Sequence, residues 1–232
     1  MAIRVGINGF GRIGRAFFRA TWNDPDVEIV GINDLGDVEN LAYLLRPDSV
    51  YHDFPATVSV QDGQMVVGDP MTSFNKAQDK SLRASKRVMF LSEKDPSRLP
   101  WKDMQVDVAI ESTGVFDTYE KAHAHITAGA KRVVITAPVK DNPQARGQNG
   151  VTVLVGVNEE KLSACVVSSN ASCTTNAASP LIAILDEKLG IEKALLNTTH
   201  AYTATQSIVD TPAHGDPRRG RRWHHDGDRH AP

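Results

Sequence analysis

Short runs of β-branched and aliphatic residues alternate with longer amphipathic runs along most of the chain. This alternation is typical of βαβ units, in which crossover helices join the strands of a mostly parallel sheet. The apolar runs predict strands over residues 3–8, 28–33, 87–91, 106–111, 132–136, 152–157 and 166–169. The amphipathic runs predict helices over residues 12–21, 38–45, 119–128 and 174–188. The pattern therefore indicates the α/β class.

Three local features refine this pattern. Residues 57–60 and 64–67 flank Asp62-Gly63, a pair that readily takes the positive φ of a tight turn, so we expect a β-hairpin there. Pro180 removes one backbone donor inside the last predicted helix, which predicts a kink. A further strand is expected over residues 194–199.

The chain changes character at Thr211. From there to Pro232 it contains four of the eight histidines, several arginines and no periodic apolar pattern. Such a segment can bury little apolar surface, so we expect residues 211–232 to form a disordered tail. No ligand-pair or helical spacing organises its histidines, aspartates and arginines, which disfavours both a metal site and a nucleic-acid patch.

Composition and charge narrow the function classes. A hydrophobic content of 41% and a charged content of 23% are ordinary for a soluble globular protein. The formal net charge of -2 gives no general attraction to nucleic acid or anionic membranes, and no apolar run reaches the ~18 residues of a membrane span. The first residues enter a predicted strand directly, so we expect no secretion signal. The balanced charge leaves a small molecule as the expected partner. Two cysteines form no disulfide framework, which favours the cytoplasm.

A glycine motif follows the first predicted strand and begins the first predicted helix: Gly9-Phe10-Gly11-Arg12-Ile13-Gly14. Glycines in this context permit a tight turn, close approach of backbone amides to a pyrophosphate, and close packing of helix on strand. Asp34 ends the second strand about 20 residues later, where a carboxylate accepts hydrogen bonds from the adenosine ribose and repels a 2′-phosphate. We therefore expect a Rossmann-type NAD site. The alternative is that the glycine motif is only a turn and that Asp34 is an ordinary turn residue.

Cys173 lies between an apolar strand and a predicted helix. The positive end of a helix dipole stabilises a thiolate, and only the thiolate is a competent nucleophile. His200 is a candidate general base. A small buried cysteine and an unreactive histidine are the alternatives, and the sequence alone does not pair the two residues. Cys165 lies within an apolar run, and we assign it no role.

Four segments in order resemble the phosphorylating glyceraldehyde-3-phosphate dehydrogenase family. They are Ile7-Asn8-Gly9-Phe10-Gly11-Arg12-Ile13-Gly14-Arg15, Glu111-Ser112-Thr113-Gly114-Val115-Phe116, Ser169-Asn170-Ala171-Ser172-Cys173-Thr174-Thr175-Asn176 and His200-Ala201-Tyr202-Thr203-Ala204-Thr205-Gln206. The resemblance runs to about residue 210 and includes the family's separation between cysteine and histidine.

The resemblance implies roles for particular residues. Cys173 would attack the aldehyde of glyceraldehyde 3-phosphate, His200 would act as the base, and phosphate would cleave the resulting thioester to 1,3-bisphosphoglycerate. Ser172 and Thr174 would hold the attacking phosphate, and Thr203 the phosphate of the substrate. The expected cofactor residues are Asn8, Gly9, Gly11, Arg12, Ile13, Gly14, Asp34, Ser112, Thr113 and Thr136. The alternative for Ser172 and Thr174 is that they cap the helix. The alternative for Ser112, Thr113 and Thr136 is that they are ordinary polar residues at strand ends.

The resemblance also implies domains and an assembly. Residues 1–171 would be the NAD-binding Rossmann domain, with a doubly wound, mostly parallel sheet. Residues 172–210 would begin an α+β catalytic domain that is incomplete, because chains of the family continue well beyond the position of residue 210. Residues 211–232 would be a divergent tail. A cytoplasmic homotetramer is implied for a complete chain. Two other functions stay open: a non-catalytic remnant that at most binds NAD, and an erythrose-4-phosphate dehydrogenase.

Overall fold

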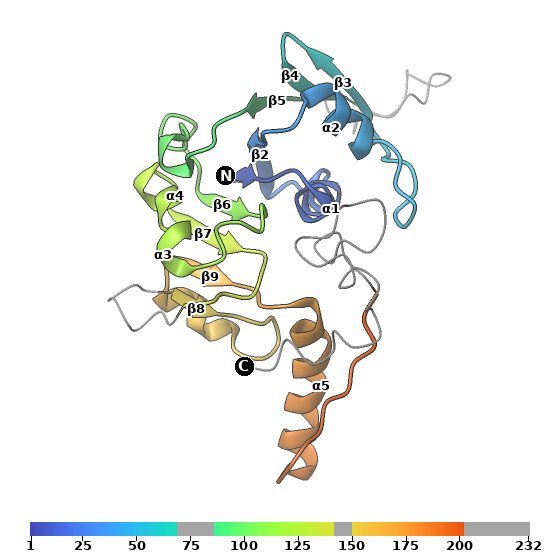
Figure 1. The fold of residues 1–232 in the computed structure, drawn as a ribbon, viewed down its shortest axis with the longest axis vertical. Coiled ribbons are helices and arrows are strands. Elements are labelled where there is room, and N and C mark those ends of the chain that lie inside the picture. Colours follow the sequence, from blue (N-terminus) through green and yellow to red (C-terminus); the bar gives the residue numbers. More distant parts are fainter. Residues whose placement is uncertain (69–85, 142–149, 202–232) are drawn as a thin grey trace, which may run out of the picture. The chain divides into compact units, whose positions relative to one another are not determined.

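One sheet organises the described part of the chain, which in this computed structural model comprises residues 1–68, 86–141 and 150–201. Its strand order is β3-β4-β5-β2-β1-β6-β7-β9-β8 (Figure 1). The strands are β1 (Ile3–Asn8), β2 (Val27–Asn33), β3 (Thr57–Gln61), β4 (Gln64–Gly68), β5 (Lys86–Leu91), β6 (Val108–Glu111), β7 (Arg132–Ile135), β8 (Gly150–Thr152) and β9 (Val167–Ser169). The helices are α1 (Arg12–Thr21), α2 (Val38–Leu45), α3 (Tyr119–Ala122), α4 (Ala124–Thr127) and α5 (Cys173–Leu189).

The strand pairing confirms the expected α/β class. β1 pairs in parallel with β2 on one side and with β6 on the other. β3, β4 and β5 pair antiparallel and extend one edge of the sheet. From β1 the chain continues to β2 on one side of the sheet and returns later to β6 on the other side. The carboxyl ends of β1 and β6 therefore form the topological switch point, where open α/β sheets bind ligands.

Local sequence explains the two helices next to this point. Glycine precedes α1, and Phe18 on the inner face of α1 stacks edge-on against Phe10, with ring centroids 5.7 Å apart. Asp37 caps α2 by accepting a hydrogen bond from the Asn40 N–H at 2.9 Å, as a helix N-cap does. The buried residues of α2 then join the same apolar cluster as Phe18: Leu41, Ala42 and Leu45.

Two expectations for residues 119–157 were wrong in detail. The expected single helix over 119–128 is two short helices, α3 and α4, separated at His123. The expected strand over 152–157 is also wrong, because β8 ends at Thr152. Gly156 there has φ +75°, and Asn158 holds a turn by accepting a hydrogen bond from Leu154 N and donating one to Thr152 O. The apolar side chains of residues 152–157 predicted a strand, but the hydrogen bonds of Asn158 hold this segment in a turn.

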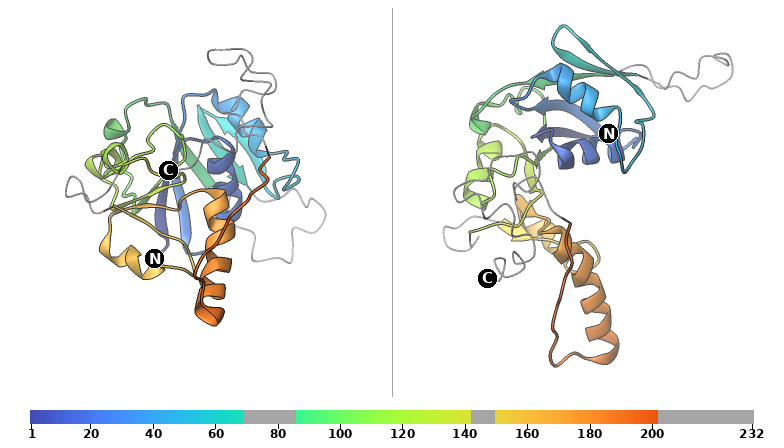
Figure 2. Two further views of the ribbon diagram at one scale, coloured as in Figure 1. Left: turned by 60° about the horizontal axis from the view of Figure 1, so that its bottom comes forward. Right: turned by 45° about the vertical axis from the view of Figure 1, so that its right-hand side comes forward.

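The chain divides into two compact units, residues 1–188 and 189–232. In the first unit α5 follows β9 (Figure 2). The helix runs through Pro180 and has no buried residue. In the second unit the strand expected over 194–199 is absent: its residues, Leu195 and Leu196 included, are exposed and form no ladder with any described strand. Residues 202–232 lie outside the described residues, so the expected tail stays a prediction. In the ranges that the structure describes, no helix is long and apolar enough to cross a membrane.

Candidate functional site

The loop of residues 9–14, here the glycine loop, follows β1 and leads into α1. Gly9 has φ +92°, and a Cβ at Gly9 would lie 2.6 Å from the backbone N of Thr113. A Cβ at Gly14 would lie 2.1 Å from the carbonyl oxygen of Gly9. Both contacts are closer than any side chain permits, so the two glycines let α1 and the end of β6 pack directly against the loop.

Gly11 differs from its neighbours. It is the N-cap residue of α1 and makes no side-chain cap, and a Cβ placed on it would meet nothing within 4 Å. The first N–H groups of an α-helix have no intrahelical acceptor and carry the positive end of the dipole. Arg12 and Ile13 form the first exposed turn of the helix. This end of α1 is therefore an open, positively polarised surface suited to an anion.

Asp34 lies beside the glycine loop at the end of β2. Its Oδ2 accepts a hydrogen bond from Phe10 N at 2.6 Å, and its Oδ1 accepts one from Gly36 N at 2.8 Å. Both carboxylate oxygens are thus oriented by backbone amides, while the side chain stays only half-buried. The predicted neighbourhood of Asp34 and the glycine loop is present in the structure.

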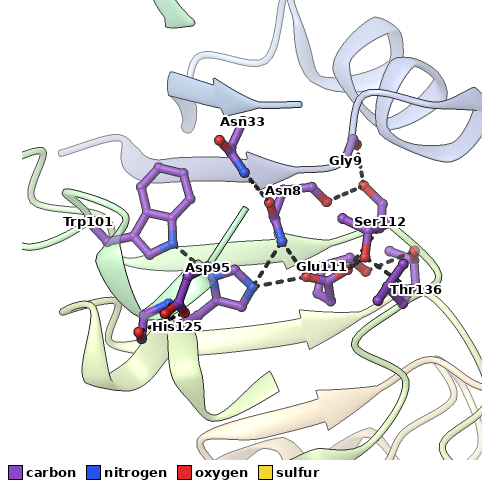
Figure 3. Close-up of polar contacts among 12 residues, drawn as sticks. Asn8, Gly9, Asn33, Asp95, Trp101, Glu111, Ser112, His125 and Thr136 are labelled. Atoms are coloured by element: carbon purple, nitrogen blue, oxygen red, sulfur yellow. Dashed lines mark hydrogen bonds and ion pairs between the residues drawn. The ribbon is translucent and has the colours of Figure 1, made fainter. Parts of the chain in front are cut away.

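A buried polar network lies beneath the glycine loop (Figure 3). The Glu111 carboxylate accepts a hydrogen bond from Asn8 Nδ2 at 2.6 Å and one from His125 Nε2 at 3.0 Å. Its other oxygen accepts from the backbone N–H of Thr113 at 2.8 Å and from the hydroxyl of the same residue. Asn33 Nδ2 donates to Asn8 Oδ1 at 2.7 Å. These bonds join the carboxyl ends of β1, β2 and β6 to α4.

Trp101 determines the protonation of His125. Its indole Nε1 donates to His125 Nδ1 at 2.9 Å, and an indole nitrogen is only ever a donor. His125 Nδ1 is therefore unprotonated, and the ring is neutral with its proton on Nε2, which donates to Glu111. The 3.4 Å approach of Asn8 Nδ2 to the same Nε2 then joins two donors and is not a hydrogen bond.

Sequence reasoning missed four members of this network: Asn33, Trp101, Glu111 and His125. The available signal was a charged residue, Glu111, at the end of an otherwise apolar strand. The structure also changes how Asn8 is understood. Its side chain is buried and both side-chain polar atoms are bonded within the protein, so direct cofactor contact by this residue stays a prediction.

Three hydroxyl groups were expected to face the dinucleotide: those of Ser112, Thr113 and Thr136. In the structure each donates a hydrogen bond to a group at or next to the end of a strand. Ser112 Oγ donates to Gly9 O at 2.7 Å, and Thr136 Oγ1 donates to Glu111 O at 3.1 Å. Thr113 Oγ1 donates to the Glu111 carboxylate. These three hydroxyls therefore stabilise the backbone near the switch point, and their contact with the dinucleotide stays a prediction.

Cys173 is exposed at the first residue of α5. Ala171, between β9 and α5, has φ +59°, an uncommon conformation for a residue with a Cβ. The Ser172 Oγ accepts a hydrogen bond from Thr175 N at 3.1 Å and lies 3.0 Å from Thr174 Oγ1. Ser172 therefore caps the helix, and this strand–turn–helix junction presents the sulfur at a helix N-terminus.

The second cysteine, to which no role was assigned, and the remaining predicted site residues lie elsewhere. Cys165 is buried, and this burial raises the pKa of its thiol although Arg132 acts in the opposite direction. His200 is exposed in the second unit, with Nδ1 2.5 Å from the carbonyl oxygen of Ala201. Cys173 belongs to the first unit and His200 to the second, so the pairing of the two residues stays a prediction. Thr203 lies outside the described residues.

Comparisons with known proteins agree with this geometry. Residues 3–119 match the family model "Glyceraldehyde 3-phosphate dehydrogenase, NAD binding domain", and residues 172–225 match "Glyceraldehyde 3-phosphate dehydrogenase, C-terminal domain". The second match extends beyond residue 210, where the resemblance was expected to end. Glyceraldehyde-3-phosphate dehydrogenase of Salmonella typhimurium is 45% identical to the chain, the cytosolic enzyme of Trypanosoma brucei brucei 45%, and enzyme A of Escherichia coli 44%. Each alignment covers 95% of this chain but 60% of the relative.

Proposed function

Because the chain belongs to the glyceraldehyde 3-phosphate dehydrogenase family, we propose that it oxidises glyceraldehyde 3-phosphate with NAD and phosphate, giving 1,3-bisphosphoglycerate. The observation that supports this most directly is the pair of helix starts within the first unit. One, at Gly11, is open and bears no side chain, and the other presents the exposed Cys173. The first suits a pyrophosphate and the second a thiolate nucleophile.

The residues at the glycine loop fit a dinucleotide. The open surface at Gly11 admits a phosphate close to the first amides of α1, with Arg12 and Ile13 on either side. The half-buried Asp34 carboxylate, fixed by two backbone amides, would accept hydrogen bonds from the ribose hydroxyls and repel a 2′-phosphate. When bound, NAD supplies the hydride acceptor for the oxidation.

The chemistry on the protein side belongs to Cys173. Its thiol proton passes to His200, and the thiolate forms a bond to the aldehyde carbon while the carbonyl oxygen takes that proton back, giving a thiohemiacetal. As hydride leaves the same carbon, His200 accepts the hydroxyl proton again. After oxidation to the thioester, inorganic phosphate attacks the same carbon and the Cys173 sulfur leaves as thiolate. Ser172 and Thr174 hold this phosphate at the start of α5, and Thr203 holds the phosphate of the substrate.

The proposal extends to domains and assembly. Residues 1–171 form the NAD-binding domain and residues 172–210 begin the catalytic domain, which is supported by the start of the second family match at residue 172. We also propose a cytoplasmic homotetramer, in keeping with the relative from Trypanosoma brucei brucei that is named as cytosolic. Metal ions have no part in this proposal.

An assay of NADH formation tests the activity. The purified chain is mixed with glyceraldehyde 3-phosphate, NAD and inorganic phosphate, and Cys173→Ser serves as the control because serine keeps the helix start but lacks the thiolate. We expect phosphate-dependent turnover by the natural sequence and none by the variant. Absence of turnover in the natural sequence, or equal turnover in both, contradicts the proposal. Faster turnover of erythrose 4-phosphate would reassign the substrate.

A further inference from the structure

One buried carboxylate joins the two backbone segments that meet at the glycine loop. Glu111 Oε2 accepts a hydrogen bond from Asn8, the residue before Gly9. Glu111 Oε1 accepts a hydrogen bond from the backbone of Thr113, the residue whose N lies 2.6 Å from a Cβ built on Gly9. The same side chain therefore holds both partners of the closest backbone contact in the loop.

The position of the loop depends on these two segments. Ser112, between Glu111 and Thr113, donates its hydroxyl to Gly9 O at 2.7 Å and its backbone N–H to Asn8 O at 2.8 Å. The Gly9 carbonyl in turn contacts Gly14 at the start of α1. A displacement at Glu111 is thus passed through three close contacts to the helix start, with no gap to absorb it.

An amide cannot take the place of the Glu111 carboxylate. Four donors surround its two oxygens, which matches the acceptor capacity of a carboxylate. A glutamine would present one oxygen and one NH₂ group, so donors would face donors on one side. His125 cannot compensate by changing tautomer, because its Nδ1 already accepts from Trp101. With side chains 1% and 0% exposed at Glu111 and His125, water cannot satisfy the lost bonds.

We propose that Glu111 is a positioning residue of the dinucleotide site. It makes no contact with the cofactor, and it holds the glycine loop in its binding geometry through Asn8 and Thr113. The inference rests on the proposed function, because it requires that NAD occupies this loop.

The test compares Glu111→Gln with Asp107→Asn in the full chain. Asp107 precedes the opposite end of β6, where its carboxylate accepts from Arg4 N at 2.9 Å and Lys131 Nζ at 2.6 Å. The two variants remove one bonded carboxylate charge from opposite ends of β6, so both should lower the urea midpoint of unfolding. Under conditions where all proteins are folded by circular dichroism, calorimetric titration with NAD should show a dissociation constant about tenfold higher for Glu111→Gln alone.

Each outcome decides one question. Failure of the natural sequence to bind NAD contradicts the proposed function and this inference together. Normal binding by the natural sequence and by folded Glu111→Gln overturns the inference alone, as does an equal loss in both variants. If Glu111→Gln does not fold, Glu111→Asp replaces it: this variant keeps the charge, but it is one methylene too short to reach Asn8 and Thr113 together. The same rise is then expected, and unchanged affinity overturns the inference.

Discussion

The guanidinium of Arg12 forms an ion pair with the carboxylate of Asp48, linking the start of α1 to the segment after α2. The same carboxylate accepts hydrogen bonds from the backbone N–H groups of Tyr51 at 3.0 Å and Val50 at 2.9 Å. These amide bonds first, and Arg12 after them, lower the pKa of Asp48 to about 2. The pair sets a negative charge beside a cation that would otherwise oppose the positive end of the helix dipole.

Replacement of Asp48 should therefore have an effect that depends on pH. Asp48→Asn keeps an oxygen to accept the two amide bonds, but it removes the charge that faces Arg12. Because the pKa of Asp48 falls from 3.8 to about 2 on folding, the charged form stabilises the fold above pH ~4 and loses this effect as pH falls toward ~2.

Urea unfolding at a series of pH values measures this effect. The natural sequence should unfold at a higher urea midpoint than Asp48→Asn near neutral pH, and the gap should narrow as the solution is acidified below pH ~4. A gap that stays constant down to the lowest pH at which both proteins fold would show that the charge of Asp48 contributes nothing.

Local signals predicted the glycine loop well. The glycines follow the apolar run of β1, and Asp34 follows the apolar run of β2. Because β1 and β2 pair in parallel, their carboxyl ends lie side by side, which brings Asp34 next to the glycine loop. The first helix was predicted with the bounds that the structure shows. These features depend on residues that are close in the chain or lie on adjacent strands. The periodicity of apolar residues predicts such local structure.

The buried network could not be predicted in the same way. Asn8 and Glu111 are 103 residues apart, and His125 reaches the same carboxylate from α4, a separate element of the chain. Nothing in the sequence shows which polar residues a fold will bury together. The failed strand over 194–199 has the opposite cause: an apolar run indicates a strand only where another strand pairs with it.

Two glycines of the loop should respond differently to alanine. Gly14→Ala places a Cβ 2.1 Å from Gly9 O, whereas Gly11→Ala places one in open space. We expect Gly14→Ala to lose ~2 kcal/mol or more of unfolding free energy through overpacking. Gly11→Ala should cost less, ~1 kcal/mol or below, because alanine is a poorer N-cap than glycine. It should weaken NAD binding, because its methyl group occupies the phosphate surface.

Urea unfolding and NAD titration of the two glycine variants separate these effects. If Gly11→Ala binds NAD as tightly as the natural sequence, the open surface at the start of α1 is not where the pyrophosphate binds.

Asp34 should select between the two nicotinamide dinucleotides. In Asp34→Ala the amides of Phe10 and Gly36 lose their acceptor, which should cost ~1 kcal/mol of stability. The lost carboxylate should also weaken NAD binding and reduce the preference for NAD over NADP. Asp37→Ala is the matched control, because it removes the cap of α2 at a similar cost. Dissociation constants for both dinucleotides are the measurement, and an unchanged NAD to NADP ratio in Asp34→Ala contradicts the assignment.

The two cysteines should differ in their rate of alkylation. Cys173 is exposed at the start of α5, where unpaired amides favour a thiolate, whereas burial both hides Cys165 and raises the pKa of its thiol. Brief treatment of the folded chain with iodoacetamide near neutral pH, followed by peptide mass mapping, should therefore label Cys173 first. In Cys173→Ser the remaining label should appear slowly and should accelerate only in urea, when Cys165 becomes exposed. Preferential labelling of Cys165 in the folded protein would show that the helix start does not activate Cys173, and the nucleophile would have to be reassigned.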